Sequence, residues 1–237
     1  MKINVHAGHN PAGKVACGAV GLINESTENR RVKDEVINLL RELGHTVYDC
    51  TVDNGIGQKD VLNKIVAKCN AHVVDLDVSI HFNSGSRDKG GNGRTTGVEV
   101  YVFSASGSAA EYAKRVCKEI ANLGFRNRGV KESKTLRVLN GTKSPAMLIE
   151  CCFVDDKDDV ELYNYRDMAA AIVYGITGQR VIETPETDRA ELDEETPSGD
   201  RNALYRVQVG AFGKKENAEK MKKKLETAGF SALIVRA

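Results

Sequence analysis

The sequence predicts an α/β fold in which short strands alternate with amphipathic helices. The clearest strand is the β-branched, mostly apolar run from Val73 to Ile80, which suits a buried strand better than a solvated helix. The run leads into His81 and Asn83, and a glycine-rich loop follows. Ligands of open α/β sheets bind at the carboxyl ends of the strands, so His81 is a candidate functional residue. A histidine that only caps a strand is the alternative.

The other elements follow from their own patterns. Val32, Val36 and Leu40 recur at helical spacing, and Gly44 is placed to end that helix, with Ser26 or Thr27 as its amino-terminal cap. Asn127 to Val130 is expected to form a loop. Strands are expected at residues 3–7, 45–50, 97–103, 135–139 and 146–149, and helices at 28–43, 59–71, 106–123 and 157–174.

Composition excludes few classes of protein. The chain has 237 residues and a formal charge of +1, which gives no support to a general nucleic-acid binder. No apolar run approaches the length of a membrane span. Residues 1–5 enter a strand without an apolar signal core, so we expect a protein made in the cytoplasm without a signal peptide.

Six cysteines are present, and none forms a CxxC pair. We expect them to be reduced and mostly buried. Cys151 and Cys152 are adjacent on a predicted strand, which would turn them to opposite faces. A thiol nucleophile at this pair is the alternative.

The chain changes character near its end. Residues 178–202 contain two prolines and few large apolar residues, and between 178 and 201 there are eight acidic and three basic side chains, which indicates a flexible acidic linker. Residues 203–237 predict a small β-α-β segment with eight basic and three acidic residues. The positive charge of this segment suggests that it binds an anionic polymer or folds against the acidic linker. The alternative is that its lysines only form a solvent-exposed face.

Two more reactive side chains stand where strands are expected to end. His9 follows Gly8 after the first strand, and Glu150 lies within an apolar stretch, where a lone carboxylate is costly unless it is paired or bound. Glu25 lies just before the first helix. It either points toward the carboxyl ends of the strands or stabilises the helix through its dipole. Two histidines and one carboxylate match a catalytic zinc site, and a further carboxylate such as Glu150 would carry the proton.

Four ordered motifs over residues 1–177 resemble the zinc-dependent N-acetylmuramoyl-L-alanine amidases found in phage endolysins and in sporulation or cell-division autolysins. They are Ala7-Gly8-His9, Gly21 to Glu25 with Asn29, Ser79 to Asn83, and Pro145 to Glu150 with Phe153. The resemblance implies a twisted, mostly parallel sheet flanked by helices. It implies Zn²⁺ held by His9, Glu25 and His81, catalysis by Glu150, and cleavage of the amide between muramic acid and L-alanine in peptidoglycan.

Some residues depart from the family pattern or are assigned only by proximity. His6 is a possible partner behind the ligands or a rival ligand, Cys152 stands where glycine is common, and Glu28 is a fallback for Glu25. We expect substrate contacts from three side chains near the motifs: Asn83, Arg87 and Arg128.

The tail from Tyr205 to Phe230 resembles the first half of the SPOR peptidoglycan-binding domain. Half a domain leaves strand edges unpaired, so we hypothesise that two chains pair through residues 203–237 to form a homodimer. A disordered remnant is the alternative.

Three rival functions remain open at this stage. A zinc carboxypeptidase would place its first histidine and glutamate closer together than His9 and Glu25. A cysteine–histidine peptidase would use Cys151 or Cys152, and a wall-binding protein would need no catalysis. A hydrolase without an export signal would reach the cell wall only after release, as a phage lysin or a sporulation autolysin does.

Overall fold

The computed structural model describes residues 1–180, 215, 219, 221–223 and 234. The predicted linker and most of the predicted C-terminal segment, including the hypothetical dimer contact, lie outside this range. Within the described residues, no helix is both long enough and apolar enough to cross a bilayer.

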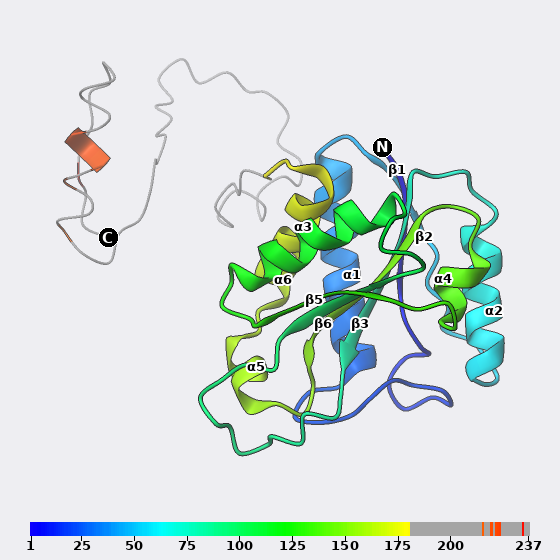
Figure 1. Ribbon diagram of the computed structural model, residues 1–237, viewed down its shortest axis with the longest axis horizontal. Helices are drawn as coiled ribbons and strands as arrows, with labels where there is room; N and C mark the ends of the chain where they lie inside the picture. Colours follow the sequence, from blue (N-terminus) through cyan, green and yellow to red (C-terminus); the bar gives the residue numbers. More distant parts are fainter. Residues whose placement is uncertain (181–214, 216–218, 220, 224–233, 235–237) are drawn as a thin grey trace, which may run out of the picture. The chain divides into compact units, whose positions relative to one another are not determined.

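Residues 1–180 form an α/β unit around one six-stranded sheet, in the order β2-β1-β3-β6-β4-β5 (Figure 1). Four of the strand pairings are parallel, and only β4 with β6 is antiparallel, so the predicted mostly parallel sheet is confirmed. The strands are β1 (Lys2–Ala7), β2 (Thr46–Asp49), β3 (Leu76–Asn83), β4 (Val98–Val102), β5 (Asn127–Glu132) and β6 (Ala146–Phe153).

Helices cover both faces of the sheet (Figure 1). One face packs against α1, α3 and α6 through a large apolar cluster that includes Val78, Ile80 and Ile149. The other face packs against α2 and α4 through a smaller cluster around Ile65 and Leu148. The helices are α1 (Glu25–Glu42), α2 (Gln58–Cys69), α3 (Ala109–Ala121), α4 (Arg137–Gly141), α5 (Lys157–Leu162) and α6 (Tyr165–Thr177).

Strand β3 has different residues on its two faces. Its apolar side chains, from Leu76 to Phe82 at every second position, belong to the large cluster. The alternate positions are polar, and they carry Asp77, Ser79 and His81. The buried strand therefore presents a row of polar groups on one face.

Two element predictions were wrong. Residues 127–130 belong to strand β5 rather than a loop, because Asn127 and Val130 pair with β4. Gly129, with φ 83°, lies at an irregularity of this pairing rather than in a turn. Residues 135–139, predicted as a strand, lead into the short helix α4, whose Val138 and Leu139 pack against α2. These two apolar residues pack against a helix here rather than pairing in the sheet.

Three element boundaries also differ from the prediction. His81 and Glu150 lie within β3 and β6 rather than just past or at a strand end. The helix predicted at 157–174 is two helices, because Asn164 caps a new one with its side chain. Helix α1 begins at Glu25, and neither Ser26 nor Thr27 is its cap, since Asn24 holds that position.

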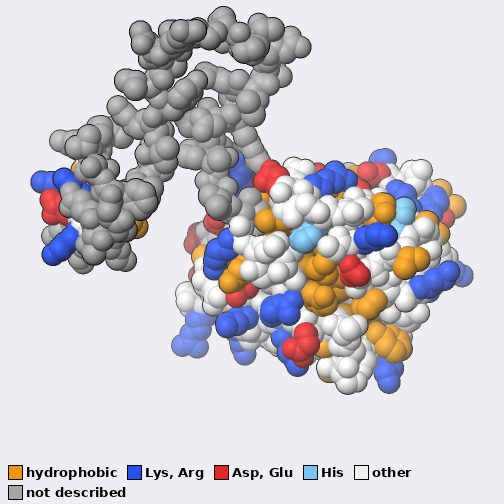
Figure 2. Space-filling view, turned by 90° about the horizontal axis from the view of Figure 1, so that it is seen from above, with side chains coloured by type: hydrophobic (Ala, Val, Ile, Leu, Met, Phe, Trp, Pro, Cys, Tyr) orange, Lys and Arg blue, Asp and Glu red, His pale blue; other side chains and the backbone are white. Residues whose placement is uncertain are grey.

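Surface charge is dispersed on the face drawn in Figure 2. Lys and Arg side chains are spread over it among hydrophobic ones rather than gathered in one stripe. This agrees with the near-zero formal charge of the chain.

Candidate metal and catalytic site

Three candidate metal donors meet at the carboxyl ends of β1 and β3. His9 comes from the loop after β1, Glu25 is the first residue of α1, and His81 lies near the end of β3. One donor atom from each lies within 4.8 Å of the other two. Glu25 Oε1 is 3.0 Å from His81 Nδ1 and 3.4 Å from His9 Nε2. We call these three residues the donor cluster.

The backbone is shaped to bring His9 into this cluster. His9 adopts φ 62°, in the left-handed region that a side chain rarely occupies. Helix α1 holds the strained peptide, because Asn29 Nδ2 donates to the Gly8 carbonyl at 3.1 Å and Arg30 donates to the His9 carbonyl at 2.9 Å. Strain supported in this way is typical of functional sites.

Glu25 is buried and firmly held as a carboxylate. It accepts hydrogen bonds from the Ala19 and Phe82 backbone amides at 2.7 and 3.2 Å. Burial alone would raise its pKa, but the hydrogen bonds with His81 and His9 outweigh burial and hold the pKa of Glu25 well below its usual range. An ionised carboxylate beside two imidazoles is suited to a cation.

Glu150 lies beside the cluster, because it pairs with His81 in the parallel register of β3 and β6. Its Oε2 atom is buried and has no hydrogen-bond partner among the described residues. Burial first, then the charges of Glu25 and Glu99, raise the pKa of Glu150 to about 8. A carboxyl group with a pKa near neutrality can both take and give a proton.

Glu99 was not singled out by the sequence analysis, yet it faces Glu150 directly in the antiparallel register of β4 and β6. It accepts hydrogen bonds from four side chains and is almost fully buried. The donors are Asn83 at 2.9 Å, Tyr101 at 2.8 Å, Arg128 at 2.6 Å and Lys131 at 2.5 Å. A glutamate within the apolar run from Val98 to Val102 was the signal that could have found it.

The three predicted substrate contacts divide into two groups. Asn83 and Arg128 meet at Glu99, beside Glu150. Arg87 lies in the loop after β3, where its backbone amide donates to Asp155 at 3.0 Å. No contact joins the Arg87 side chain to the donor cluster among the described residues.

Other sequence candidates lie outside the donor cluster. Glu28 binds Arg31 and the Tyr163 hydroxyl instead. His6 is buried in β1 and is not one of the three donors. Burial, and then the charge of His81, lowers its pKa to about 3.

All six cysteines are free, and all but Cys17 are buried. Cys151 and Cys152 both belong to the apolar cluster under α1, α3 and α6, so the expectation that they face opposite sides was wrong. The register of β3 and β6 shifts at this point, which breaks the strand alternation. Burial raises the pKa of both thiols well above the usual value, which disfavours a thiolate nucleophile.

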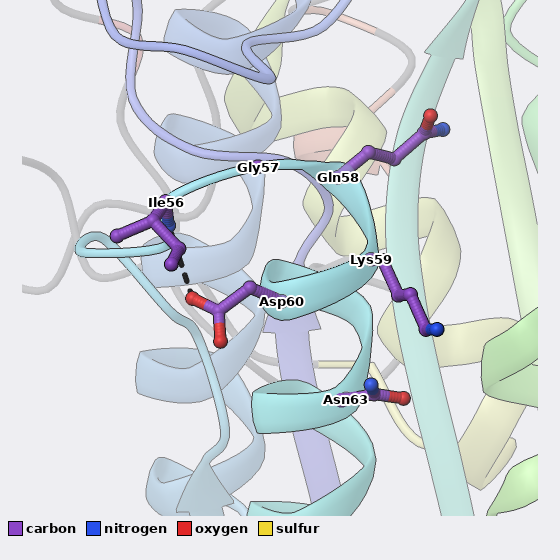
Figure 3. A pocket seen from close by; sticks show the side chains of 6 residues that line it. All are labelled: Ile56, Gly57, Gln58, Lys59, Asp60 and Asn63. Atoms are coloured by element: carbon purple, nitrogen blue, oxygen red, sulfur yellow. Dashed lines mark hydrogen bonds between the residues drawn. The ribbon is translucent and has the colours of Figure 1, made fainter.

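A separate hollow lies at the amino end of α2 (Figure 3). The Ile56 amide donates to Asp60 across it at 3.0 Å. It contains no residue of the donor cluster and so has no part in the site. Its lining residues are Ile56, Gly57, Gln58, Lys59, Asp60 and Asn63.

A mostly parallel α/β sheet with two histidines and two carboxylates at one edge defines the class of candidate metal-dependent hydrolases. Comparison with known proteins gives the family: residues 3–178 match the N-acetylmuramoyl-L-alanine amidase model, so the chain belongs to this family. Residues 202–237 match the SPOR domain model.

Relatives and solved structures agree with this assignment. An uncharacterised Clostridium perfringens protein is 35% identical over 190 residues, which are 77% of this chain and 53% of that protein. The amidase CwlM of Bacillus licheniformis is 31% identical, over 70% of this chain and 58% of its own. The catalytic domain of the CD27L endolysin, which targets Clostridia difficile, superimposes with a TM-score of 0.68 at 28% identity, over 77% of this chain and 99% of that domain. The chain spans little more than half the length of these two curated relatives.

Proposed function

We propose that this chain hydrolyses the amide bond between N-acetylmuramic acid and L-alanine in bacterial peptidoglycan, as a cell-wall lytic enzyme. The observation that carries the proposal is Glu150, whose buried Oε2 atom has no described partner, beside three convergent donors. Membership of the amidase family supports the choice of bond.

The proposal assigns Zn²⁺ to His9, Glu25 and His81. Two imidazoles and a carboxylate fit zinc, and three protein ligands are the usual number at catalytic zinc sites. When bound, the metal would polarise the carbonyl group and lower the pKa of water. The low pKa of Glu25 suits a ligand that stays ionised.

In this mechanism Glu150 acts first as the general base and then as the general acid. Its carboxylate takes a proton from the attacking water as the carbon–oxygen bond forms at the lactyl carbonyl. The same proton then passes to the nitrogen of L-alanine as the carbon–nitrogen bond breaks. The burial that raises the pKa of Glu150 keeps both directions of transfer accessible near neutral pH.

Mass spectrometry of digested peptidoglycan tests the bond that is cut. We expect new L-alanine amino termini without new reducing sugars, and loss of both activity and zinc on chelation. Glu150→Gln keeps the shape of the side chain but removes its basicity, so activity should fall by about 10²-fold or more while zinc content stays unchanged.

Glu111→Gln is the matched control, because Glu111 is exposed on α3 and pairs with Lys114 at the surface. Full activity of the Glu150→Gln protein would refute the assigned role. New reducing sugars in place of L-alanine termini would refute the assigned reaction.

We also propose the division into a catalytic domain at 1–177, a linker at 178–202 and a SPOR-like peptidoglycan-binding segment at 203–237. The ranges of the two family matches support it. Association of two chains through the last segment stays a prediction. A change from dimer to monomer in light scattering on removing residues 202–237 would support it, and an unchanged monomer would refute it.

A further inference from the structure

The carboxyl group of Glu150 lies between two polar residues of the neighbouring strands. In the sheet, β6 lies between β3 and β4, so Glu150 pairs with His81 on one side and with Glu99 on the other. Beyond Glu99, strand β5 contributes Arg128 and Lys131. We call these two residues the cation pair.

An irregularity in β5 creates the cation pair. Residues three apart in a regular strand point to opposite faces. Here Val98 pairs with Asn127 and Val100 with Val130, so two residues of β5 lie opposite Glu99 alone. This is a β-bulge, and Gly129 within it adopts φ 83°. The extra residue lets Arg128 and Lys131 both reach Glu99.

Glu99 holds both members of the cation pair, and Arg128 still has donors that are not used within the described residues. Arg128 uses Nε for Glu99, and no described residue accepts from its two terminal nitrogens. Its guanidinium also lies 5.0 Å from the centre of the Phe153 ring. The side chains of Arg128 and Lys131 are 28% and 37% exposed, while that of Glu99 is 3% exposed. Arg128 and Lys131 together carry two positive charges, and Glu99 balances one of them. The group around Glu99 therefore carries a net positive charge beside Glu150.

The chemistry of the substrate restricts what this charge can bind. The lactyl carboxyl group of muramic acid is consumed in the scissile amide, so the free carboxylates lie on the peptide side. The second residue of the peptide carries an α-carboxyl group, which some cell walls leave free and others convert to a carboxamide. A forked guanidinium with an adjacent ammonium is suited to a planar carboxylate.

We propose that Arg128 and Lys131 bind a free carboxylate of the peptide that leaves with L-alanine, and that Glu99 is the positioning residue that holds them. This inference rests on the proposed amidase function and extends it to the choice of peptide. The enzyme then distinguishes carboxylate from carboxamide peptides at a site separate from the donor cluster.

The test compares two synthetic muramoyl peptides that differ only in a carboxylate or a carboxamide at the second residue. With the full zinc-loaded chain, kcat/KM should be about tenfold higher for the carboxylate, the size expected of one charge-assisted contact. Arg128→Gln and Lys131→Gln should each bring the ratio toward one, because they lower kcat/KM for the carboxylate more than for the carboxamide. Lys131→Arg should keep the preference.

Further variants test whether the positions of Arg128 and Lys131 matter, or only their positive charge. Glu99→Gln should weaken the preference although both cations remain, and Gly129→Ala should do the same because its φ disfavours a side chain. Lys118→Gln is the control for loss of a positive charge, because Lys118 lies on the exposed side of α3. Zinc content and melting temperature identify any variant that fails to fold. In that case Lys131→Arg tests the proposal, because it keeps the positive charge and should keep the preference for the carboxylate.

Equal cleavage of both peptides by the wild type would overturn this inference alone. An unchanged ratio in Arg128→Gln and Lys131→Gln would also overturn it. If the wild type cleaves neither peptide with zinc bound, the proposed amidase function itself fails.

Discussion

The space where a Cβ atom of residue 8 would lie is filled by the imidazole of His81. A Cβ built on Gly8 would lie 2.0 Å from His81 Cε1, far inside van der Waals contact. Glycine at this position therefore lets the first donor loop pass directly beside the second histidine.

Gly8→Ala should displace His81 and weaken zinc binding by about tenfold or more, with a matching loss of activity. Competition with a fluorescent chelator measures the zinc affinity. Gly57→Ala is the control, because nothing lies within 4 Å of its Cβ position. Equal zinc affinity in the two variants would contradict the steric account.

His6 makes stability depend on pH. Its folded pKa is about 3, below the usual 6.5, because burial disfavours the charged ring. Once the chain unfolds, His6 takes up a proton below about pH 6.5, so the free energy of unfolding should fall as the pH drops from 6.5 toward 3.

Urea denaturation between pH 7 and pH 4 measures this loss. His6→Gln should flatten the dependence by up to about 1.4 kcal/mol per pH unit, which corresponds to one proton. His9 and His81 are present in both proteins and cancel in the difference. Identical slopes for the two proteins would show that His6 is not buried as a neutral ring.

Sequence reasoning found the donor cluster and Glu150 because each stands out locally, as a polar residue beside an apolar run or a glycine. It did not find Glu99, although a glutamate among valines is the same kind of signal. The contacts that explain Glu99 come from residues 83, 101, 128 and 131. Such a group depends on strand order and register, which local patterns do not contain.

At the scale of elements, the first turns of α1 organise the donor loop. Arg30 donates to the carbonyls of His9 and Ser26 and pairs with Asp53 at 2.7 Å. It thus connects the loop after β1 to the helix that carries Glu25. The sequence analysis predicted the helix but not this connection.

Arg30→Met should weaken zinc binding by about tenfold without removing a ligand, because residues that orient ligands contribute on that order. Isothermal titration with zinc measures the change. Arg31→Met is the matched control, because Arg31 follows Arg30 in the helix but is half exposed and pairs with Glu28. Equal effects of the two substitutions would show that Arg30 acts only through its charge.

The elements that were predicted correctly are those whose periodicity is regular, such as α1 and β1. The errors lie where a short element relies on its neighbours. Strand β5 contains glycine and asparagine but is held by β4, and α4 has only five residues and is held by α2. Tertiary contacts override local preference at these places.

At the scale of the molecule, the polar residues of β3 lie on one face of the sheet. One face is covered by α1, α3 and α6 through the large apolar cluster, while the other is covered by α2 and α4 through the smaller one and also carries the polar row that ends at His81. The parallel pairing of β1, β3 and β6 brings distant residues to one edge. The order of strands, with β4 and β5 reversed, was not predictable from spacing.

A chain of residues 1–180 should fold and keep its activity on a soluble muramoyl peptide, because the donor cluster, Glu150 and the cores described here all lie within it. The same truncation should reduce binding to glycan strands stripped of peptides, which a sedimentation assay measures. Unchanged sedimentation would refute a wall-binding role for residues 203–237. Loss of the soluble activity would show that the catalytic domain extends further.

The strand order β3-β6-β4-β5 places the donor cluster and the group around Glu99 on opposite sides of Glu150. The residues that would hold the ion are encoded before position 82, and the group around Glu99 lies between positions 99 and 131, apart from Asn83. Under the proposed functions, mutations in the later stretch would change which peptides are cleaved without altering the residues that would hold the metal.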